Sequence, residues 1–126
     1  MKVRAIGYVE NSADASTSGK AWASTESRVV IEPSLIAGLE GLEPGREILV
    51  LFWFDRSRGF DLLQHPKGDT SRPRRGVFTL RSPHRPNPIG VSQVELLAVD
   101  VNVLHVRGLD AYHGTPVLDI KPVKRL

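Results

Sequence analysis

The chain has 126 residues, no cysteine, 40% apolar residues, and 17 Lys and Arg against 14 Asp and Glu, for a formal net charge of +3. This length fits one soluble domain over residues 1–126, and the lack of cysteine excludes disulfides, thiolate zinc sites and a cysteine nucleophile, which favours the cytoplasm. The first residues lack the pattern of a signal peptide. The longest apolar run, Ile48–Phe54, is far shorter than the about 20 residues that span a bilayer, so we expect neither secretion nor membrane insertion.

The first half of the sequence predicts three strands and one short helical turn. Val3–Val9 has the composition of a strand, and Asn11–Ser27, rich in Ser, Ala, Thr and Gly, is typical of a long loop. Arg28–Glu32 predicts a second strand, and a proline then opens a helical turn at Ser34–Leu39. Arg46–Phe54 predicts a continuously apolar strand, and continuity rather than alternation indicates that both of its faces are covered.

The middle of the sequence is rich in turn residues. Phe60–Gln64 and Gly76–Leu80 are apolar enough for short strands, and His65–Pro73 between them has the composition of a loop. Ser82–Gly90 holds three prolines in nine residues, which excludes a regular helix or a central strand there.

The last third predicts a hairpin and a final strand. Val91–Val99 alternates apolar with polar residues, and its predicted core face consists of Val94, Leu96 and Ala98. A turn at Asp100–Asn102 leads into a strand at Val103–Arg107, and a last strand, Thr115–Lys121, follows. Six to eight short strands, one helical turn and no helical crossover predict an all-β, mainly antiparallel fold, with an open or closed β-barrel as its architecture.

The positive charge is concentrated in one part of the chain. Residues 1–55 carry a net charge of −3, residues 56–85 a net charge of +6, and residues 86–126 are neutral overall. The basic part includes Lys67, Arg72, Arg74 and Arg75, a spacing that suits phosphate contacts, although a solvated loop is the alternative.

Two further segments could carry chemistry. In Arg81–Gly90, prolines stiffen a loop rich in hydrogen-bond donors, so it could hold a preorganised polar pocket or could simply connect two strands. In Gly108–Pro122, a Gly-Thr-Pro turn precedes Asp119 and Lys121, which share one strand face and could be a site or only a surface ion pair. The sequence contains no glycine-rich dinucleotide fingerprint, no Walker lysine motif and no histidines at metal-ligand spacing, so we predict no metal.

Long stretches of the sequence resemble the TsaA-like, or TrmO, family of tRNA methyltransferases. They are Gly76–Ser92, which contains Arg85-Pro86-Asn87, together with Gly108–Asp110, Gly114–Pro122 and the strand region Leu42–Phe54. The resemblance implies an S-adenosylmethionine-dependent enzyme on a single-sheeted β-barrel, working as a homodimer. It further implies methylation of the exocyclic nitrogen of threonylcarbamoyladenosine beside the anticodon of tRNA.

The resemblance also assigns residues and shows departures from the family pattern. The positions where the family contacts its cofactor are Asp55, Arg56, Arg81, Val91, Gly114, Thr115, Pro116 and Val117. Where the family carries Pro-Arg-Gln in its N-terminal loop, this sequence reads Ser18–Ala23, and His113 and Val123 stand where Asp and Tyr are usual. The chain ends at Leu126, so we expect a short form without the further C-terminal domain of longer members.

For the chemistry, we hypothesise that Asp119 removes the proton of the acceptor nitrogen, with Asn87 orienting the acceptor and Lys121 holding Asp119 ionised. The residues expected to hold tRNA phosphates are Arg72, Arg74, Arg75 and Arg85. Two other hypotheses remain open at this point. One is a non-catalytic barrel that binds RNA or a nucleotide and has lost methyl transfer together with the Pro-Arg-Gln wall, and the other is a dimeric structural protein.

Overall fold

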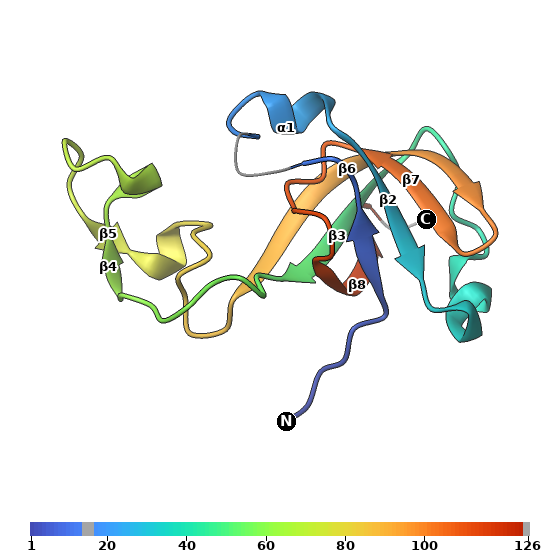
Figure 1. The fold of residues 1–126 in the computed structure, drawn as a ribbon, viewed down its shortest axis with the longest axis horizontal. Coiled ribbons are helices and arrows are strands. Elements are labelled where there is room, and N and C mark those ends of the chain that lie inside the picture. The colour runs from blue at the N-terminus through green and yellow to red at the C-terminus, as the bar shows by residue number, and fades with distance from the viewer. Residues whose placement is uncertain (14–16, 125–126) are drawn as a thin grey trace.

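Six antiparallel strands form a closed barrel (Figure 1). The computed structural model describes residues 1–13 and 17–124. Around the barrel the strands follow the order β1-β2-β7-β6-β3-β8. Their bounds are β1 Gly7–Glu10, β2 Glu26–Ile31, β3 Glu47–Trp53, β6 Ile89–Asp100, β7 Val103–Arg107 and β8 Pro116–Pro122. The predicted all-β, mainly antiparallel, single-sheeted β-barrel is therefore confirmed.

The barrel has one interior, which the strands fill with alternate side chains. In β3, Ile48, Val50 and Phe52 are at most 2% exposed, whereas the residues between them are only half-buried. The prediction that both faces of this strand are covered is therefore wrong. A closed barrel buries only its inner face, so an apolar run leaves its alternate residues on the outside.

A bulge in β6 changes which of its residues face the interior. Val94 and Leu96 are buried as predicted, but Ala98 is only half-buried, and Val99 packs against the core. The pairing with β7 shifts between Leu96 and Ala98. Because a bulge inserts one extra residue, it reverses the inward and outward alternation beyond it, and the predicted core face is wrong for its last residue.

The hairpin between β6 and β7 forms as predicted. Its turn contains Val101, which has a φ of +56° and is 70% exposed. The next residue, Asn102, donates a side-chain hydrogen bond to the Ile31 carbonyl at 2.8 Å. A β-branched residue in the left-handed region is strained, so this turn stores an unfavourable conformation that the hydrogen bond to β2 holds in place.

The N-terminal elements differ from the prediction mainly in their bounds. The first strand occupies Gly7–Glu10 rather than Val3–Val9, and the predicted helical turn is a 3₁₀ helix over Pro33–Leu39. The predicted loop Asn11–Ser27 contains residues 14–16, which lie outside the described residues. Within it the structure has a four-residue helix, α1 Ala21–Ser24, and the first two residues of β2.

Residues 54–88 form an arm that leaves the barrel between β3 and β6, and Figure 1 shows it projecting to one side. The barrel strands meet again at its base, where Trp53 pairs with Ile89. The arm contains a two-stranded sheet of β4 Leu63–Gln64 and β5 Arg75–Gly76. The strand predicted at Gly76–Leu80 is wrong, because beyond β5 the chain turns into a 3₁₀ helix at Val77–Thr79.

Hydrogen bonds between its segments hold the arm together. The Gln64 side chain donates to the His84 carbonyl at 2.5 Å, and the Val77 amide donates to the Leu62 carbonyl at 2.8 Å. At its outer turn, the Asp69 carboxylate accepts hydrogen bonds from the Ser71 hydroxyl at 2.6 Å and from the Ser71 amide at 2.9 Å. These two bonds, that from the hydroxyl above all, lower the pKa of Asp69. No helix among the described residues is long and apolar enough to cross a membrane.

Candidate functional site

A cavity of about 510 Å³ lies where the arm joins the barrel, and we call it the arm-base cavity. Its volume falls in the range of small-molecule sites. Its apolar wall consists of Trp22, Phe52, Phe54, Leu80, Ile89 and Val91. Its polar side chains are those of Arg81, Arg85, Ser92, Gln93 and Asp110. These residues come from α1, β3, the arm, β6 and the segment after β7, so the cavity exists only in the folded chain.

The aromatic part of the wall depends on a glycine. The rings of Phe52 and Phe54 meet edge to face, with centroids 5.2 Å apart and an angle of 75° between their planes. They pack against Gly90 of β6, where a Cβ atom would lie 2.5 Å from Phe52 Cε2 and 2.8 Å from Phe54 Cζ. Only a residue without a side chain fits at this point, so Gly90 allows the two rings to reach the cavity.

The polar groups of the cavity include one carboxylate and two guanidinium groups. Asp110 follows the fully buried Leu109, and its amide donates to the Ser92 hydroxyl at 3.3 Å. Although the residue as a whole is exposed, partial burial of its carboxyl group raises the pKa of Asp110. Arg85 is half-buried, and its Nη1 donates to the carbonyls of Leu80 at 2.9 Å and Ser82 at 3.1 Å. The cavity therefore offers groups of both charges beside an apolar wall.

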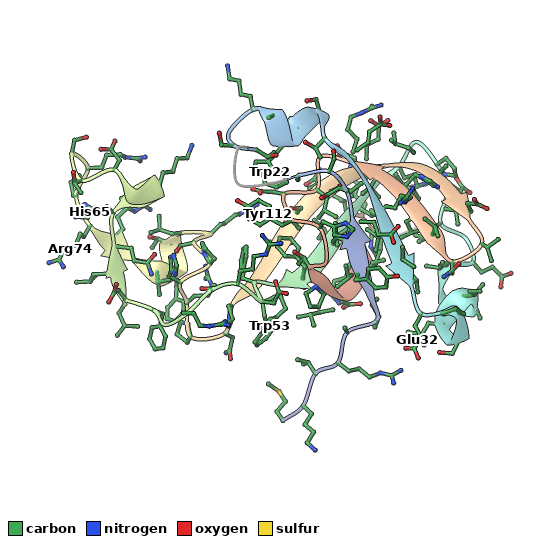
Figure 2. The ribbon with its side chains drawn as sticks, viewed as in Figure 1. Trp22, Glu32, Trp53, His65, Arg74 and Tyr112 are labelled. Carbon is green, nitrogen blue, oxygen red and sulfur yellow. The ribbon has the colours of Figure 1, made fainter. Side chains whose placement is uncertain are left out.

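The helix α1 contributes Trp22 to the cavity, and Figure 2 shows this side chain beside Tyr112. The two rings meet edge to face, with centroids 5.5 Å apart. The guanidinium group of Arg56 lies over the Tyr112 ring, with its carbon 4.9 Å from the ring centroid, and this is an attractive cation–π geometry. Arg56 also donates to the His113 carbonyl at 3.4 Å. Arg56, Tyr112 and Trp22 thus form a continuous stack from the arm to α1.

The segment Gly114–Val117 serves the fold in this structure. Gly114 has a φ of +87° and donates its amide to the Val9 carbonyl at 2.7 Å, and the Val9 amide donates to the Thr115 carbonyl at 2.9 Å. Thr115 is 5% exposed, and Val117 is fully buried in the core. Pro116 is half-buried at the start of β8. The prediction that these four residues contact a cofactor stays a prediction.

His113 and Asp55 flank this region. The amide of Asn11 donates to His113 Nδ1 at 3.2 Å, an acceptor role that an aspartate at this position could also fill. Asp55 is exposed, and its amide donates to the Trp53 carbonyl at 2.9 Å. Neither Asp55 nor Arg56 is among the residues that line the arm-base cavity.

The three residues hypothesised to act on the acceptor lie outside the arm-base cavity. Asp119 and Lys121 sit on the same face of β8 as predicted, with a carboxylate oxygen 3.0 Å from Lys121 Nζ. Their side chains are 49% and 57% exposed, so the pair is open to solvent. Asn87 is exposed, and its carbonyl accepts the Ile89 amide at 2.7 Å. The roles of Asp119, Lys121 and Asn87 stay predictions.

The arm has a groove of its own, with a volume of about 1260 Å³, which we call the basic groove. The cationic side chains that line it are Lys67, Arg72, Arg74, Arg75 and Arg81, and Figure 2 shows Arg74 at the outer end of the arm. None of them has an ion-pair partner within residues 1–13 and 17–124. Leu80 and Arg81 line both the basic groove and the arm-base cavity, so the two adjoin.

Sequence reasoning found part of the cavity. Of the predicted cofactor residues, Arg81 and Val91 line it, and Arg85, predicted to hold a phosphate, lines it as well. The prediction missed Trp22 and Asp110. Asp110 lies in the recognised stretch Gly108–Asp110, which was a usable signal. Trp22 lies in Ser18–Ala23, where the family carries its Pro-Arg-Gln wall, so the resemblance pointed to this segment, although the loop composition alone does not indicate that the indole reaches the cavity.

No three His, Asp or Glu side chains in the described part of the chain are placed to hold a metal ion.

Comparison with known proteins gives concordant matches. Residues 8–125 match the family described as the tRNA-methyltransferase O N-terminal domain. A solved structure of TrmO from Pseudomonas aeruginosa superposes with a TM-score of 0.77 and 31% identity, over 98% of this chain and 56% of that one.

Two curated relatives come from Archaeoglobus fulgidus. One, named "Probable S-adenosyl-L-methionine-binding protein", is 50% identical over 94 residues, which cover 75% of this chain and 25% of that protein. The other, an S-adenosyl-L-methionine-binding protein, is 42% identical over 125 residues, which cover 96% of this chain and 88% of that protein. The chain thus spans one quarter of the first relative and nearly all of the second.

Proposed function

The chain belongs to the family of the tRNA-methyltransferase O N-terminal domain, and on that premise we propose that it binds S-adenosylmethionine in the arm-base cavity and methylates a nucleoside of tRNA. One observation carries the proposal. The arm-base cavity, which suits a small cofactor, shares Leu80 and Arg81 with the basic groove, which suits phosphates. A polynucleotide in the groove would therefore bring its bases to the mouth of the cavity.

The residues of the cavity fit the chemical groups of this cofactor. Its purine matches the aromatic wall, its carboxylate matches Arg81 or Arg85, and its hydroxyl and ammonium groups match the Asp110 carboxylate. The names of the two Archaeoglobus relatives support the same ligand. When bound, S-adenosylmethionine supplies an electrophilic methyl group on a sulfonium.

The cavity walls would exclude water and hold the reacting groups in line. The acceptor nitrogen of an amide-like group is a weak nucleophile, so a base that takes its proton contributes a factor of about 10² to 10⁴. We keep the hypothesis that Asp119, which lies outside the arm-base cavity and 3.0 Å from Lys121 Nζ, takes this proton, with Asn87 orienting the acceptor. Because Asp110 is the carboxylate in the cavity itself, its task is to hold the cofactor.

As the finer substrate we propose the exocyclic nitrogen of threonylcarbamoyladenosine, which the resemblance implies. The basic groove beside the cavity supports an RNA substrate. The site of action is then the cytoplasm, where tRNA is found. The alternative, a barrel that binds RNA or a nucleotide without methyl transfer, predicts the same groove but no cofactor affinity.

A homodimer is part of the proposal. The arm exposes four large apolar side chains, Phe60, Leu62, Leu63 and Phe78, with exposed fractions between 50% and 76%. Their burial against a second copy would remove apolar area from water. Light scattering should therefore give twice the chain mass, and Phe78→Ser should shift it toward the monomer; a monomeric wild-type protein would contradict this part.

Calorimetry with S-adenosylmethionine is the first test of the function. We expect saturable binding in the micromolar range, and no heat at millimolar cofactor would favour the non-catalytic alternative. The second test is transfer of a labelled methyl group to tRNA with and without threonylcarbamoyladenosine, where incorporation into both would contradict the finer substrate.

A matched pair of variants then separates the two carboxylates. Asp119→Asn should keep cofactor affinity and lower the single-turnover rate by at least about tenfold, whereas Asp110→Asn should weaken cofactor binding. An unchanged single-turnover rate in Asp119→Asn would remove Asp119 as the base.

A further inference from the structure

We propose that Trp22 is a specificity-determining residue of the arm-base cavity, whose indole packs against the purine of the bound cofactor. The inference rests on the proposed function, since it concerns which part of S-adenosylmethionine meets which wall. Trp22 is half-buried and lines the cavity. An indole face offers a large, rigid contact area for a flat heteroaromatic ring.

The helix that carries Trp22 is held mainly from outside. Helix α1 has four residues, no buried side chain and no side-chain cap at its N-terminus. So short a helix does not persist by itself in water. Among the described residues, contacts that tie it to the barrel include the Trp22 ring on Tyr112 and the hydrogen bond from the Gly108 amide to the Thr25 carbonyl at 3.0 Å. Trp22 is thus the side chain that fixes α1 over the cavity.

Trp22 is supported by Tyr112, which is itself held by Arg56. Its edge-to-face partner, Tyr112, is covered by the Arg56 guanidinium at 4.9 Å, and Arg56 is in turn bonded to the His113 carbonyl at 3.4 Å. These contacts limit the motion of the Tyr112 ring and so the position of the indole. We assign Tyr112 and Arg56 as positioning residues that act through Trp22.

The chemistry of the neighbouring walls decides which part of the cofactor Trp22 meets. The α1 region contributes Gly19, Trp22 and Ala23 to the cavity. Their only polar side-chain group is the indole N–H of Trp22, and none of them is charged. The charged groups, Arg81, Arg85 and Asp110, come from the arm and from the segment after β7. The amino-acid end of the cofactor therefore belongs with those groups, and the purine belongs against α1.

The chain offers a matched control and a built-in reporter. It has two tryptophans, Trp22 and Trp53, and Trp53 is not among the residues that line the cavity. In a Trp53→Phe protein all indole emission comes from Trp22. Figure 2 shows the two side chains at different places, Trp22 beneath α1 and Trp53 where β3 meets the arm.

The experiment measures binding by calorimetry for wild type, Trp22→Ala, Trp22→Phe and Trp53→Phe, with S-adenosylmethionine, adenosine and methionine as separate probes. Trp22→Ala should weaken S-adenosylmethionine and adenosine binding by about tenfold or more, equivalent to about 1.4 kcal/mol. Its methionine affinity should stay unchanged, and Trp22→Phe should restore most of the loss. In Trp53→Phe, the emission of Trp22 should change on titration with the midpoint that calorimetry gives.

The outcomes are distinguishable. If the wild-type protein binds S-adenosylmethionine and Trp22→Ala binds it within twofold, the inference is wrong and the proposed function stands. The same holds if Trp22 emission does not respond at saturation, a readout that does not depend on the Ala variant folding. If the wild-type protein binds no S-adenosylmethionine, the proposed function itself is wrong.

Discussion

Replacing Gly90 by alanine tests whether the aromatic wall of the arm-base cavity is as tightly fitted as the structure shows. The new Cβ would lie 2.5 Å from Phe52 Cε2, 2.6 Å from Phe52 Cζ and 2.8 Å from Phe54 Cζ. These distances are far inside van der Waals contact, so at least one ring must move. Phe52 is 2% exposed and enclosed by the core, whereas Phe54 is half-buried at the cavity. Because the two shortest distances are to Phe52, we expect that ring to shift within the core and to displace its edge-to-face partner Phe54 further into the cavity.

The size of the effect follows from two opposing terms. Overpacking a well-filled site costs about 1–3 kcal/mol. Replacing glycine by alanine in a strand stabilises the protein by about 0.5–1 kcal/mol, because alanine loses less conformational entropy on folding. The free energy of unfolding should thus fall by up to about 2.5 kcal/mol, with about 1 kcal/mol at the centre of the two ranges. Because Phe54 would occupy part of the cavity, S-adenosylmethionine affinity should fall as well.

Urea unfolding at neutral pH, followed by circular dichroism, measures the first quantity, and calorimetry the second. Gly38→Ala is the matched control, since Gly38 has no positive φ and its Cβ would meet nothing within 4 Å. Adding Phe54→Leu to Gly90→Ala should recover part of the lost stability by removing ring atoms. If Gly90→Ala proves as stable as Gly38→Ala and binds the cofactor equally well, the fit of the two rings is not what we describe.

Three further predictions concern the groove, the cavity carboxylate and the hairpin turn. The double variant Arg74→Ala and Arg75→Ala should bind tRNA more weakly, and the slope of log K against log salt concentration should become shallower by about 1.4–1.8. The control is Arg107→Ala, which breaks a surface ion pair with Glu95 at 3.0 Å. An unaltered slope in the double variant would mean that the basic groove does not bind RNA. Burial raises the pKa of Asp110 in the folded state above its ordinary value of 3.8. The ionised carboxylate therefore destabilises the folded protein, an effect that is absent below pH 3.8 and fully present above the raised pKa. The free energy of unfolding of Asp110→Asn relative to wild type should therefore increase as the pH rises through that window. If urea unfolding gives the same difference below and above the window, this prediction is wrong. Val101→Asn should raise the free energy of unfolding by about 0.5–1 kcal/mol, because asparagine tolerates the left-handed conformation that Val101 adopts with a φ of +56°; an equal or lower melting temperature would refute this.

The sequence predicts the barrel strands well, because their signals are local. Alternation in Val91–Val99 and the turn at Asp100–Asn102 reflect the pleat of a single strand and the geometry of a single turn, and both formed. The bulge that moves Val99 inward in place of Ala98 depends on the partner strand β7. Such a shift in pairing leaves no mark on local hydrophobicity, so the pattern of one strand could not reveal it.

The candidate site is harder to predict because distant segments build it. Arg81 and Val91 could be assigned from a recognised stretch of sequence, and both line the cavity. Trp22 reaches the same cavity from a segment rich in small residues, through its contact with Tyr112, which lies 90 positions further along the chain. Its place depends on tertiary packing that loop composition does not encode.

The pairing of Trp53 with Ile89 fixes the register of β3 and β6 directly at the base of the arm. Apart from Phe54, which packs against the core, and Arg56, which contacts Tyr112, the residues between these two are for the barrel a tether, and the entropic cost of a tether grows only with the logarithm of its length. Exchanging residues 54–88 for a four-residue connection would change the entropic free energy of closing this loop by only about 2 kcal/mol, although it would remove the whole basic groove. Beyond Phe54 and Arg56, the strand pairing of the barrel therefore does not depend on the length or composition of the arm, so the segment that we propose to hold the nucleic acid can change while the paired strands beneath it stay the same.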